Sequence, residues 1–256
     1  AARGNCPALR TVIGVGALDA TLNRSDLNLE GVLSQQSNVF GLVETRADEA
    51  AVLIYTSGTT GHPKGVVYSH RSSYLHSMAV CSGNGMALGF SDRALPIVPM
   101  FHANAWGAPY AAAMVRAKLV LPGPHLDGES VFNLLKQERV TFSQGVPTVW
   151  MMLFQYLDAN PHLDPKALGV KRVGIGGAAV ARGMLERFEN QFGAEVVQGW
   201  GMTETSPIGV ISKLLPKHAN VPAEDLIKTK LKQGRGVWGV DLKIVDENGQ
   251  IGRAHV

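Results

Sequence analysis

Short apolar runs alternate with amphipathic segments along most of the chain, and this alternation constrains the fold more than any other feature. The apolar runs read RTVIGV, AVLIYT, GVVYS, ALPIVPM, KLVLPG, VTFSQGV, KRVGIGG and EVVQGWG. Helical periodicity is clearest over residues 69–78, 130–138, 147–160 and 180–192. We therefore expect an α/β fold in which helices flank layered, largely parallel sheets, with functional loops at the carboxyl ends of the strands.

Composition and charge exclude several classes of protein. The chain has 256 residues, of which 45% are hydrophobic and 18% charged, so it can bury a globular core. Its formal net charge is +3, and its basic and acidic residues are interspersed, which argues against a nucleic-acid partner. The longest stretch without charge, residues 94–115, is interrupted by prolines and by His102 and Asn104, so we expect no transmembrane segment.

Cysteine usage bears on the cellular location, and a change of amino-acid composition bears on the domain organisation. Cys6 and Cys81 form no CxxC pair, so neither a disulfide scaffold nor a structural zinc site is expected, and the expected location is cytoplasmic. Beyond Ser206 the sequence becomes polar and lysine-rich before a strand and turn resume. We expect an α/β core over residues 1–205, then a surface excursion that starts a second sheet subdomain over residues 206–256.

The stretch YTSGTTGHPKG, residues 55–65, has the composition of an anion-binding loop between two β-prone runs. Glycine amides can approach phosphate oxygens closely, the Thr and Ser hydroxyls add donors, and Lys64 adds charge. A Walker loop does not fit, because Gly65 follows the lysine where a Ser or Thr would bind magnesium, and Val66 and Val67 favour a strand. The alternative is a flexible surface hairpin.

A second glycine-rich stretch, GIGGAA at residues 174–179, fits the G-x-G-x-x-A fingerprint of a dinucleotide-binding turn. That fingerprint expects an acid at the end of the following strand, whereas Glu195 stands at the start of VVQGWG. A third stretch, GVGALD at residues 14–19, is interpreted as an ordinary turn after a strand.

Two further segments carry candidate site residues. QGWGMTET, residues 198–205, sets Trp200 between glycines, where a purine could stack, and Glu204 follows as a hard oxygen ligand for magnesium. PMFHANAWG, residues 99–107, places His102 and Asn104 just beyond an apolar strand. Taken alone, each segment is equally compatible with a structural role, as a core-capping tryptophan or a satisfied polar pair.

Taken together and in this order, these motifs resemble the adenylate-forming enzymes, which comprise acyl- and aryl-CoA synthetases, nonribosomal-peptide adenylation domains and beetle luciferases. YTSGTTGHPKG resembles the signature loop of that family, GGAAV its adenine-side turn, QGWGMTET its aromatic-Gly-x-Thr-Glu segment and GRGVWGVDLKIVD the segment that follows. FHANAWG looks like the fatty-acyl-CoA synthetase branch, including medium-chain and methylmercaptopropionate ligases. The resemblance implies the middle part of the large amino-terminal domain of such an enzyme.

The resemblance also implies a mechanism and its small-molecule partners. A carboxylic acid attacks the α-phosphate of ATP with Mg2+ to give an acyl-adenylate and pyrophosphate, and the thiol of coenzyme A then displaces AMP. Both reactants of the first step are anionic, so the protein must position them and neutralise the phosphate charge. Gly107, Ala108 and the alanines at residues 111–113 have small side chains. Such residues leave room for an alkyl chain, but they equally allow close helix packing.

Residue roles follow from the same resemblance. The catalytic residues would be Lys64, His102, Thr203, which donates to the α-phosphate, and Glu204, which ligates Mg2+. The ATP site would comprise Thr56, Ser57, Gly58, Thr59, Thr60, Gly61 and Lys64 around the β- and γ-phosphates, Gly177, Ala178, Ala179, Gln198, Gly199 and Trp200 around the adenine, and Gly201, Met202 and Thr203. The acyl pocket would involve His102, Asn104 and Trp106.

Family features are missing, and other functions stay open. The Thr-Gly-Asp segment that binds ribose, the hinge, the lysine-bearing carboxyl-terminal lid domain and a large amino-terminal portion are not found, so we expect a core fragment that is inactive alone. Within the same chemistry, the alternatives are an aryl-CoA ligase and an amino-acid adenylation domain. From other classes, they are a dinucleotide-dependent oxidoreductase built on Gly174 to Ala179 and a non-catalytic nucleotide-binding module. The sequence leaves a homodimer open.

Overall fold

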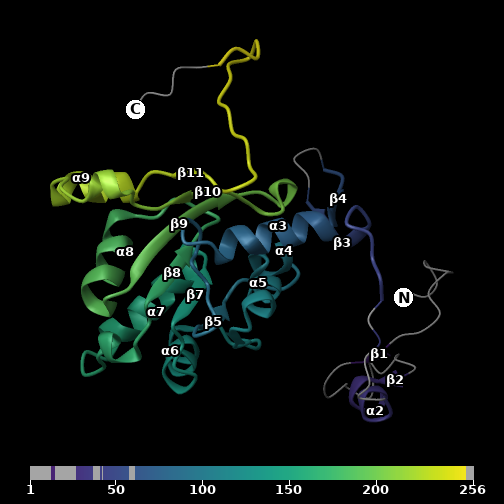
Figure 1. Ribbon diagram of the computed structural model, residues 1–256. Helices are drawn as coiled ribbons and strands as arrows, with labels where there is room; N and C mark the ends of the chain where they lie inside the picture. The colour runs from purple at the N-terminus through teal and green to yellow at the C-terminus, as the bar shows by residue number, and fades with distance from the viewer. Residues whose placement is uncertain (1–12, 15–26, 37–40, 42, 58–60, 252–256) are drawn as a thin grey trace. The chain divides into compact units, whose positions relative to one another are not determined.

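The computed structural model describes residues 13–14, 27–36, 41, 43–57 and 61–251, in a chain that divides into two compact units after Thr45 (Figure 1). In the first unit, β1 (Ile13–Gly14) pairs in parallel with β2 (Leu27–Asn28), and α2 (Leu29–Ser34) follows directly. The second unit, Arg46–Val256, contains the central sheet and every described candidate site residue.

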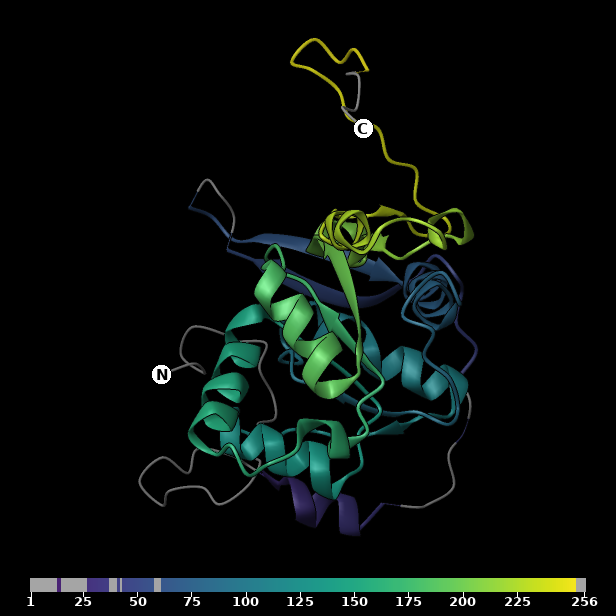
Figure 2. The ribbon, with the colours of Figure 1, turned by 90° about the vertical axis from the view of Figure 1, so that its left-hand side faces the viewer.

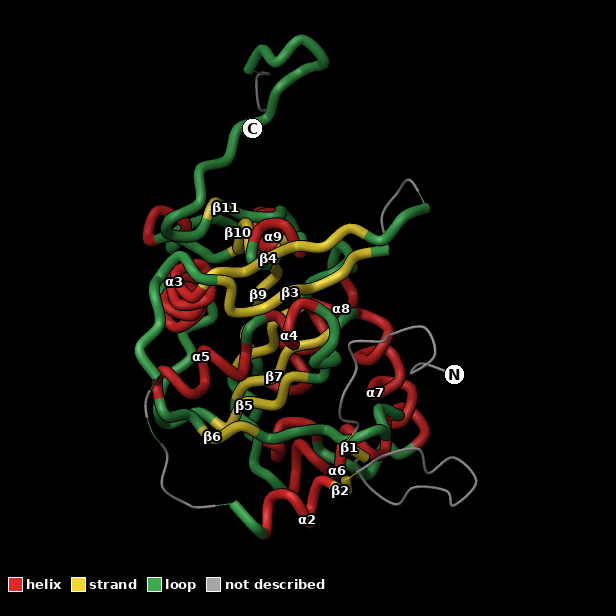
Figure 3. The backbone as a smooth tube through the Cα atoms, turned by 90° about the vertical axis from the view of Figure 1, so that its right-hand side faces the viewer, coloured by secondary structure: helices red, strands yellow, loops and turns green. Residues whose placement is uncertain are grey.

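Seven strands form the central sheet in the order β11-β10-β9-β8-β7-β5-β6. The five parallel strands are β5 (Arg93–Pro96), β6 (Lys118–Leu119), β7 (Phe142–Gly145), β8 (Arg172–Ile175) and β9 (Glu195–Gly201). Two strands, β10 (Ile208–Ser212) and β11 (Arg235–Gly236), lie at one edge of the sheet (Figure 3). They run antiparallel to their neighbours. The sheet is largely parallel, which confirms the α/β prediction.

The helices cover both faces of this sheet (Figure 2). One face packs against α3 (His70–Cys81) and α5 (Ala108–Val115), in a core that includes Phe142 and Val197. The other packs against α6 (Gly128–Gln137), α7 (Pro147–Ala159) and α8 (Arg182–Arg187), in a larger core. Because consecutive side chains of a strand point to opposite faces, β5 contributes Leu95 to the larger core and Ala94 to the smaller one, and β9 likewise contributes Val196 and Val197.

Capping residues explain where the predicted helices begin. Ser69 accepts a hydrogen bond from the Ser72 N–H at 3.1 Å, so α3 starts one residue beyond the predicted boundary. Asp127 accepts from the Ser130 N–H at 3.0 Å and starts α6. The single helix predicted over 180–192 is instead two segments, because α8 passes into a wider π turn at Phe188–Phe192.

The anion-loop stretch connects two strands of a separate hairpin. β3 (Ala50–Thr56) pairs antiparallel with β4 (Lys64–Ser69), and Thr56 is the partner of Lys64. Gly58, Thr59 and Thr60 lie outside the described residues. The strands before and after the loop therefore agree with the sequence analysis.

The last part of the second unit continues the sheet and adds a short helix. β10 pairs with β9, so the boundary that we predict at Ser206 falls between two paired strands, and it stays a prediction. The lysine-rich excursion contains α9 (Ala223–Lys230). None of the helices in the described part of the chain is long and apolar enough to span a bilayer.

Candidate functional site

A cavity of about 330 Å³ opens at the carboxyl ends of β7, β8 and β9, where a parallel sheet places its functional loops. Three turns meet there: one after β5, one after β8 and one after β9. The lining residues are His76, Val80, Met86, His102, Ala103, Trp106, Gln144, Ile175, Gly176, Gly177, Gly199, Trp200, Gly201, Met202, Thr203, Pro207 and Ile208. The FHANAWG, GGAAV and QGWGMTET motifs all contribute to this lining.

The FHANAWG motif forms a left-handed turn, labelled α4 (Ala103–Trp106), in the cavity wall. All four of its residues have φ between 45° and 53°. Left-handed backbone costs about 1–2 kcal/mol per L-residue, so tertiary contacts must hold the turn. Gln144 Nε2 donates to the Ala105 carbonyl oxygen at 2.7 Å, and Asn104 Nδ2 donates to the Tyr110 hydroxyl at 2.6 Å.

The glycines after β8 let the turn around them approach the Trp106 indole. A Cβ at Gly176 would lie 3.0 Å from the Gly199 carbonyl oxygen and 3.3 Å from Trp106 Cη2, so a larger residue does not fit without displacement. Gly177 has a φ of 78°, a region that favours glycine. The motif assigned to the adenine thus lies directly against the tryptophan assigned to the acyl pocket.

Trp200 lines the cavity and remains 39% exposed. A Cβ at Gly209 would lie 2.8 Å from Trp200 Cζ3, so the indole packs on β10 where the neighbouring strand has no side chain. An indole that is supported by a strand and partly exposed can offer a surface to a purine. Adenine stacking on Trp200 stays a prediction.

Tyr68 on β4 joins the hairpin to the QGWGMTET segment. It is 3% exposed, and its hydroxyl donates to the Thr203 carbonyl oxygen at 2.7 Å. Burial, and to a smaller extent the negative charge of Glu204, raises the pKa of Tyr68 to about 12. Tyr68 is therefore a neutral donor near pH 7, and it holds the Thr-Glu pair beside the strand that follows the anion loop.

Glu204 is exposed, and among the described residues its carboxylate has no hydrogen bond or ion pair. Within that part of the chain, no group of three or more His, Cys, Asp or Glu side chains could enclose a metal ion. Mg2+ commonly takes one or two protein carboxylates together with phosphate oxygens and water. A single open carboxylate therefore fits a Mg2+ ion that arrives with a nucleotide.

His76 on α3 is a buried polar side chain in the cavity lining. It is 7% exposed, and its Nε2 has no hydrogen-bond partner among the described residues. Burial lowers the pKa of His76 to about 4, so the imidazole is neutral near pH 7. A Cβ at Gly107 would lie 2.5 Å from His76 Cε1, so the ring packs directly on the end of the left-handed turn.

The structure brings together only part of the predicted site. The predicted residues that line the cavity are His102, Trp106, Gly177, Gly199, Trp200, Gly201, Met202 and Thr203. The described predicted residues outside that lining are Thr56, Ser57, Gly61, Lys64, Asn104, Ala178, Ala179, Gln198 and Glu204. Lys64 is exposed at the start of β4, so its phosphate role remains a prediction.

Gln198 lies in β9 beneath the turn that follows β8, and its side chain is bonded to main-chain groups. It is 1% exposed, its Oε1 accepts from the Val180 N–H at 2.8 Å, and its Nε2 donates to the carbonyl oxygens of Leu231 and Lys232 at 3.3 and 3.2 Å. The amide is thus occupied within the protein. A contact between Gln198 and adenine stays a prediction.

Two other interpretations are corrected or decided by the structure. The GIGGAA stretch lacks the geometry of a dinucleotide-binding turn, because Gly174 lies within β8 and α8 begins only at Arg182, beyond the last fingerprint position.

The small residues of α5 pack against α3. Ala111 and Ala112 are at most 1% exposed in the core between α5 and α3, and they do not line the cavity. These small residues serve helix packing.

Sequence reasoning missed His76, Gln144 and Tyr68. Gln144 carries a usable signal, because a glutamine inside the apolar run VTFSQGV is an unusual polar group for a buried strand. Tyr68 ends the apolar run GVVYS, and only the three-dimensional pairing reveals its hydroxyl contact. His76 lies in a helix of weak amphipathicity, whose pattern does not single out one buried face.

Relatives of known activity match most of this chain. A medium-chain-fatty-acid–CoA ligase of Ectopseudomonas oleovorans is 44% identical over 220 residues, which is 86% of this chain and 40% of that protein. A 3-methylmercaptopropionyl-CoA ligase of Ruegeria lacuscaerulensis is 40% identical over 96% of this chain and 43% of that protein. A long-chain-fatty-acid–CoA ligase of Thermus thermophilus is 42% identical over 94% and 43%, respectively. The chain thus spans 40 to 43% of the length of these relatives.

Solved structures and a family match complete the comparison. The inhibitor-bound N-terminal domain of FACL13 from Mycobacterium tuberculosis superposes with a TM-score of 0.73 at 26% identity, over 92% of this chain and 56% of that one. The anthranilate CoA ligase AuaEII has the same fold, with a TM-score of 0.81 at 21% identity over 99% of this chain and 46% of that one. Residues 4–255 match the family described as AMP-binding enzyme. The chain therefore belongs to the AMP-binding enzyme family.

Proposed function

We propose that this protein activates a fatty acid with ATP as an acyl-adenylate and then transfers the acyl group to coenzyme A. The observation that carries the proposal is the cavity in which the FHANAWG turn meets the turns after β8 and β9. Relatives at 40 to 44% identity are fatty-acid and methylmercaptopropionate CoA ligases, which supports the acid class.

The lining of the cavity contains groups that suit two different reactants. Val80, Met86 and Ile175 offer apolar surface to an alkyl chain, whereas the glycine-rich turns carrying Gly177 and Gly201 leave main-chain groups accessible to a nucleotide. Trp106 also lines the cavity and packs against Gly176. The acid and the nucleotide would therefore meet near Trp106 and His102.

The proposed chemistry requires positioning and no enzyme nucleophile. A carboxylate oxygen attacks the α-phosphorus of ATP, and the bond to the pyrophosphate oxygen breaks. The coenzyme A thiolate then attacks the acyl carbon, and AMP leaves. Thr203, whose carbonyl oxygen accepts from Tyr68, would donate to the α-phosphate, and Lys64 would contact the other phosphates.

A magnesium ion is part of the proposal, with Glu204 as its protein ligand. The supporting observation is that the carboxylate is exposed and makes no hydrogen bond or ion pair within the part of the chain that the structure describes. When bound, Mg2+ would neutralise charge on the nucleotide phosphates. The proposed setting is the cytoplasm and lipid metabolism, which the absence of a CxxC pair and the fatty-acid relatives support.

The test is an ATP–pyrophosphate exchange assay with the complete gene product, including whatever sequence flanks this chain. Acid panels would contain short, medium and long fatty acids, benzoate and amino acids. Exchange that depends on a fatty acid, followed by acyl-CoA formation, is the expected result. Exchange driven only by benzoate or only by an amino acid would instead identify the aryl-CoA ligase or the adenylation domain, and no exchange with any acid would reject the proposal.

A further inference from the structure

Two buried glutamines lie near the carboxyl ends of the parallel strands on either side of β8. Gln144 in β7 is 3% exposed and pairs with Gly174 of β8, while Gln198 in β9 is 1% exposed and pairs with Ile175 of the same strand. A buried amide is costly unless its polar atoms find partners. The partners of each glutamine therefore indicate what that glutamine does.

Gln144 holds one wall of the cavity. Its Nε2 donates to the Ala105 carbonyl oxygen at 2.7 Å, in the middle of the left-handed turn 103–106. L-residues resist this conformation, so the turn keeps its shape only while outside contacts hold it. The same turn presents Trp106 to the cavity, on the side proposed for the acid.

Gln198 holds a second part of the cavity wall. Its Oε1 accepts from the Val180 N–H, which ends the turn 176–180 after β8, and its Nε2 donates to the carbonyl oxygens of Leu231 and Lys232. These acceptors lie 33 and 34 positions further along the chain, directly after α9. One amide thus ties the nucleotide-side turn to a helix that is remote in sequence.

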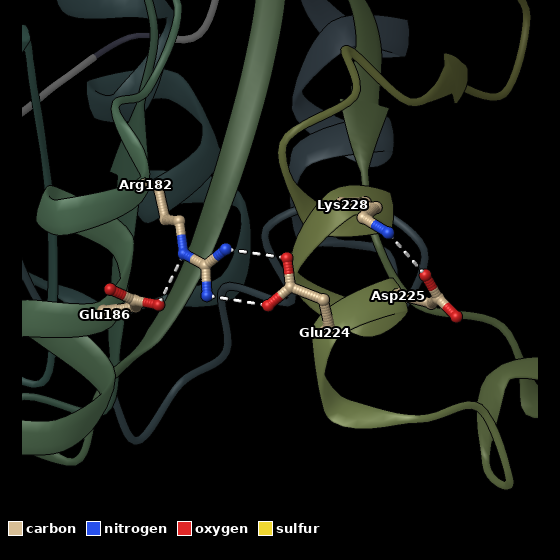
Figure 4. A network of polar contacts seen from close by, with 5 residues as sticks. All are labelled: Arg182, Glu186, Glu224, Asp225 and Lys228. Carbon is tan, nitrogen blue, oxygen red and sulfur yellow. Dashed lines mark hydrogen bonds and ion pairs between the residues drawn. The ribbon is translucent and has the colours of Figure 1, made fainter.

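The helix α9, directly before these carbonyl oxygens, is itself held to α8 and to the π turn that follows α8. Lys230 Nζ donates to both carboxylate oxygens of Glu189 at 2.6 and 2.8 Å. Figure 4 shows the Arg182 guanidinium of α8 facing the Glu224 carboxylate of α9, with bonds of 2.7 and 2.8 Å. The carbonyl oxygens that Gln198 reaches therefore belong to an anchored element, which makes them suitable supports for a turn.

We propose that Gln144 and Gln198 are positioning residues that separately set the acid-side and the nucleotide-side walls of this cavity. The inference rests on the proposed function. Each glutamine acts through main-chain groups of a turn, so neither needs to touch a substrate. Removing one amide should loosen one turn and leave the other in place.

The experiment compares Gln144→Leu with Gln198→Leu, two substitutions of similar size at buried sites in neighbouring regions. Pyrophosphate exchange in the complete gene product gives kcat and the KM values for ATP and for the acid. Q144L should raise the KM for the acid about tenfold and leave that for ATP within about twofold, where tenfold corresponds to about 1.4 kcal/mol. Q198L should show the reverse.

A matched control separates positioning from general destabilisation. Ser143 is fully buried beside Gln144, and its hydroxyl donates to the Leu95 carbonyl oxygen at 2.7 Å, away from both turns. Ser143→Ala should lower Tm without changing either KM. If a leucine variant does not fold, Gln144→Met or Gln198→Met keeps the unbranched side chain and removes both polar groups of the amide, and it carries the same expectation.

Amide hydrogen exchange tests the same inference without activity. Q144L should speed exchange over residues 103–107 only, and Q198L over residues 176–180 only. Equal changes in both KM values, or faster exchange in both turns from either variant, would overturn the inference. An enzyme that activates no acid but shows the selective exchange pattern would reject the proposed function and support the positioning roles.

Discussion

At the scale of single residues, His76 gives the protein a stability that depends on pH. Burial lowers the pKa of this histidine from 6.5 to about 4 in the folded chain, so between these values the unfolded chain binds more protons. The free energy of unfolding should therefore fall as the pH drops from 6.5 to about 4, by about 3 kcal/mol from this residue. Below about pH 4, His76 is protonated in both the folded and the unfolded chain, so it adds no further pH dependence to the free energy of unfolding.

The measurement is urea unfolding of the parent chain and of His76→Gln across this pH range. The free energy of unfolding of the parent, minus that of His76→Gln, should decrease as the solution becomes more acidic. His125 is exposed, so His125→Gln should leave the pH dependence of the parent unchanged. A parallel pH dependence in the parent and in His76→Gln would show that His76 is charged or solvated in the fold.

Glu204 provides the second prediction at this scale. Glu204→Gln keeps the side-chain shape but removes an anionic oxygen ligand, so adenylation should need several-fold more magnesium, about the effect of losing one weak ligand. A magnesium titration of pyrophosphate exchange measures this shift, with the exposed Glu129→Gln on α6 as control. Identical titrations for Glu204→Gln and the parent would show that Glu204 does not ligate Mg2+, and its remaining role would be its effect on the pKa of Tyr68.

Residues of the motifs could be predicted where the prediction depends only on their neighbours in the sequence. Trp106, Trp200 and Thr203 line one cavity, because each motif follows the end of a parallel strand, while the roles that the motifs assign to them stay predictions. Tyr68 could not be predicted, since its partner Thr203 lies 135 positions away. The same limit applies to Gln198, whose residue type was noted while its main-chain partners were not.

At the scale of elements, the junction between α8 and the π turn is the centre of an aromatic cluster on its face of the sheet. Phe188 is 1% exposed, and its ring centroid lies 5.4 Å from that of Trp150 and 5.0 Å from those of Phe154 and Phe192. Phe188→Ala should lower the free energy of unfolding by about 3–5 kcal/mol. Phe90, which is 82% exposed, gives a control whose truncation should change it by less than about 0.5 kcal/mol.

Urea unfolding distinguishes this packing role from a change in the unfolded state. Phe188→Ala should lower the midpoint without changing the slope of free energy against denaturant. A loss similar to that of Phe90→Ala would show that the aromatic cluster contributes little. The helix over 180–192 was predictable from its apolar periodicity, but the change to a π turn was not, because an inserted residue alters the period only locally.

At the scale of the whole molecule, the parallel sheet was predictable, whereas the pairing across Ser206 was not. Apolar runs separated by helices predict strands buried on both faces, as β5, β7 and β8 are. The change of composition after Ser206 suggests a new subdomain, yet β10 pairs with β9 before the lysine-rich excursion, and β11 pairs with β10 after it. Composition records the exposed excursion and carries no information on which strand the chain pairs with afterwards.

The exposed face of the β3–β4 hairpin leads to a prediction about association. Leu53 and Tyr55 alternate along β3, and Val67 is the partner of Leu53 on β4; these side chains are 56%, 66% and 59% exposed. An apolar cluster on a two-stranded sheet favours contact with another apolar surface, and a two-stranded sheet also has unpaired edges. We therefore expect the fraction of associated chains to rise with protein concentration.

Sedimentation velocity over a range of concentrations tests this prediction. The double variant Leu53→Lys with Val67→Glu places opposite charges across one strand pair, so it removes the apolar surface while preserving the hairpin. It should shift the distribution toward the monomer, whereas Phe90→Lys, a charge at an exposed site outside the hairpin, should not. If both variants reduce association equally, exposed apolar side chains promote association wherever they lie and this face is not the specific contact, because the double variant leaves the net charge unchanged.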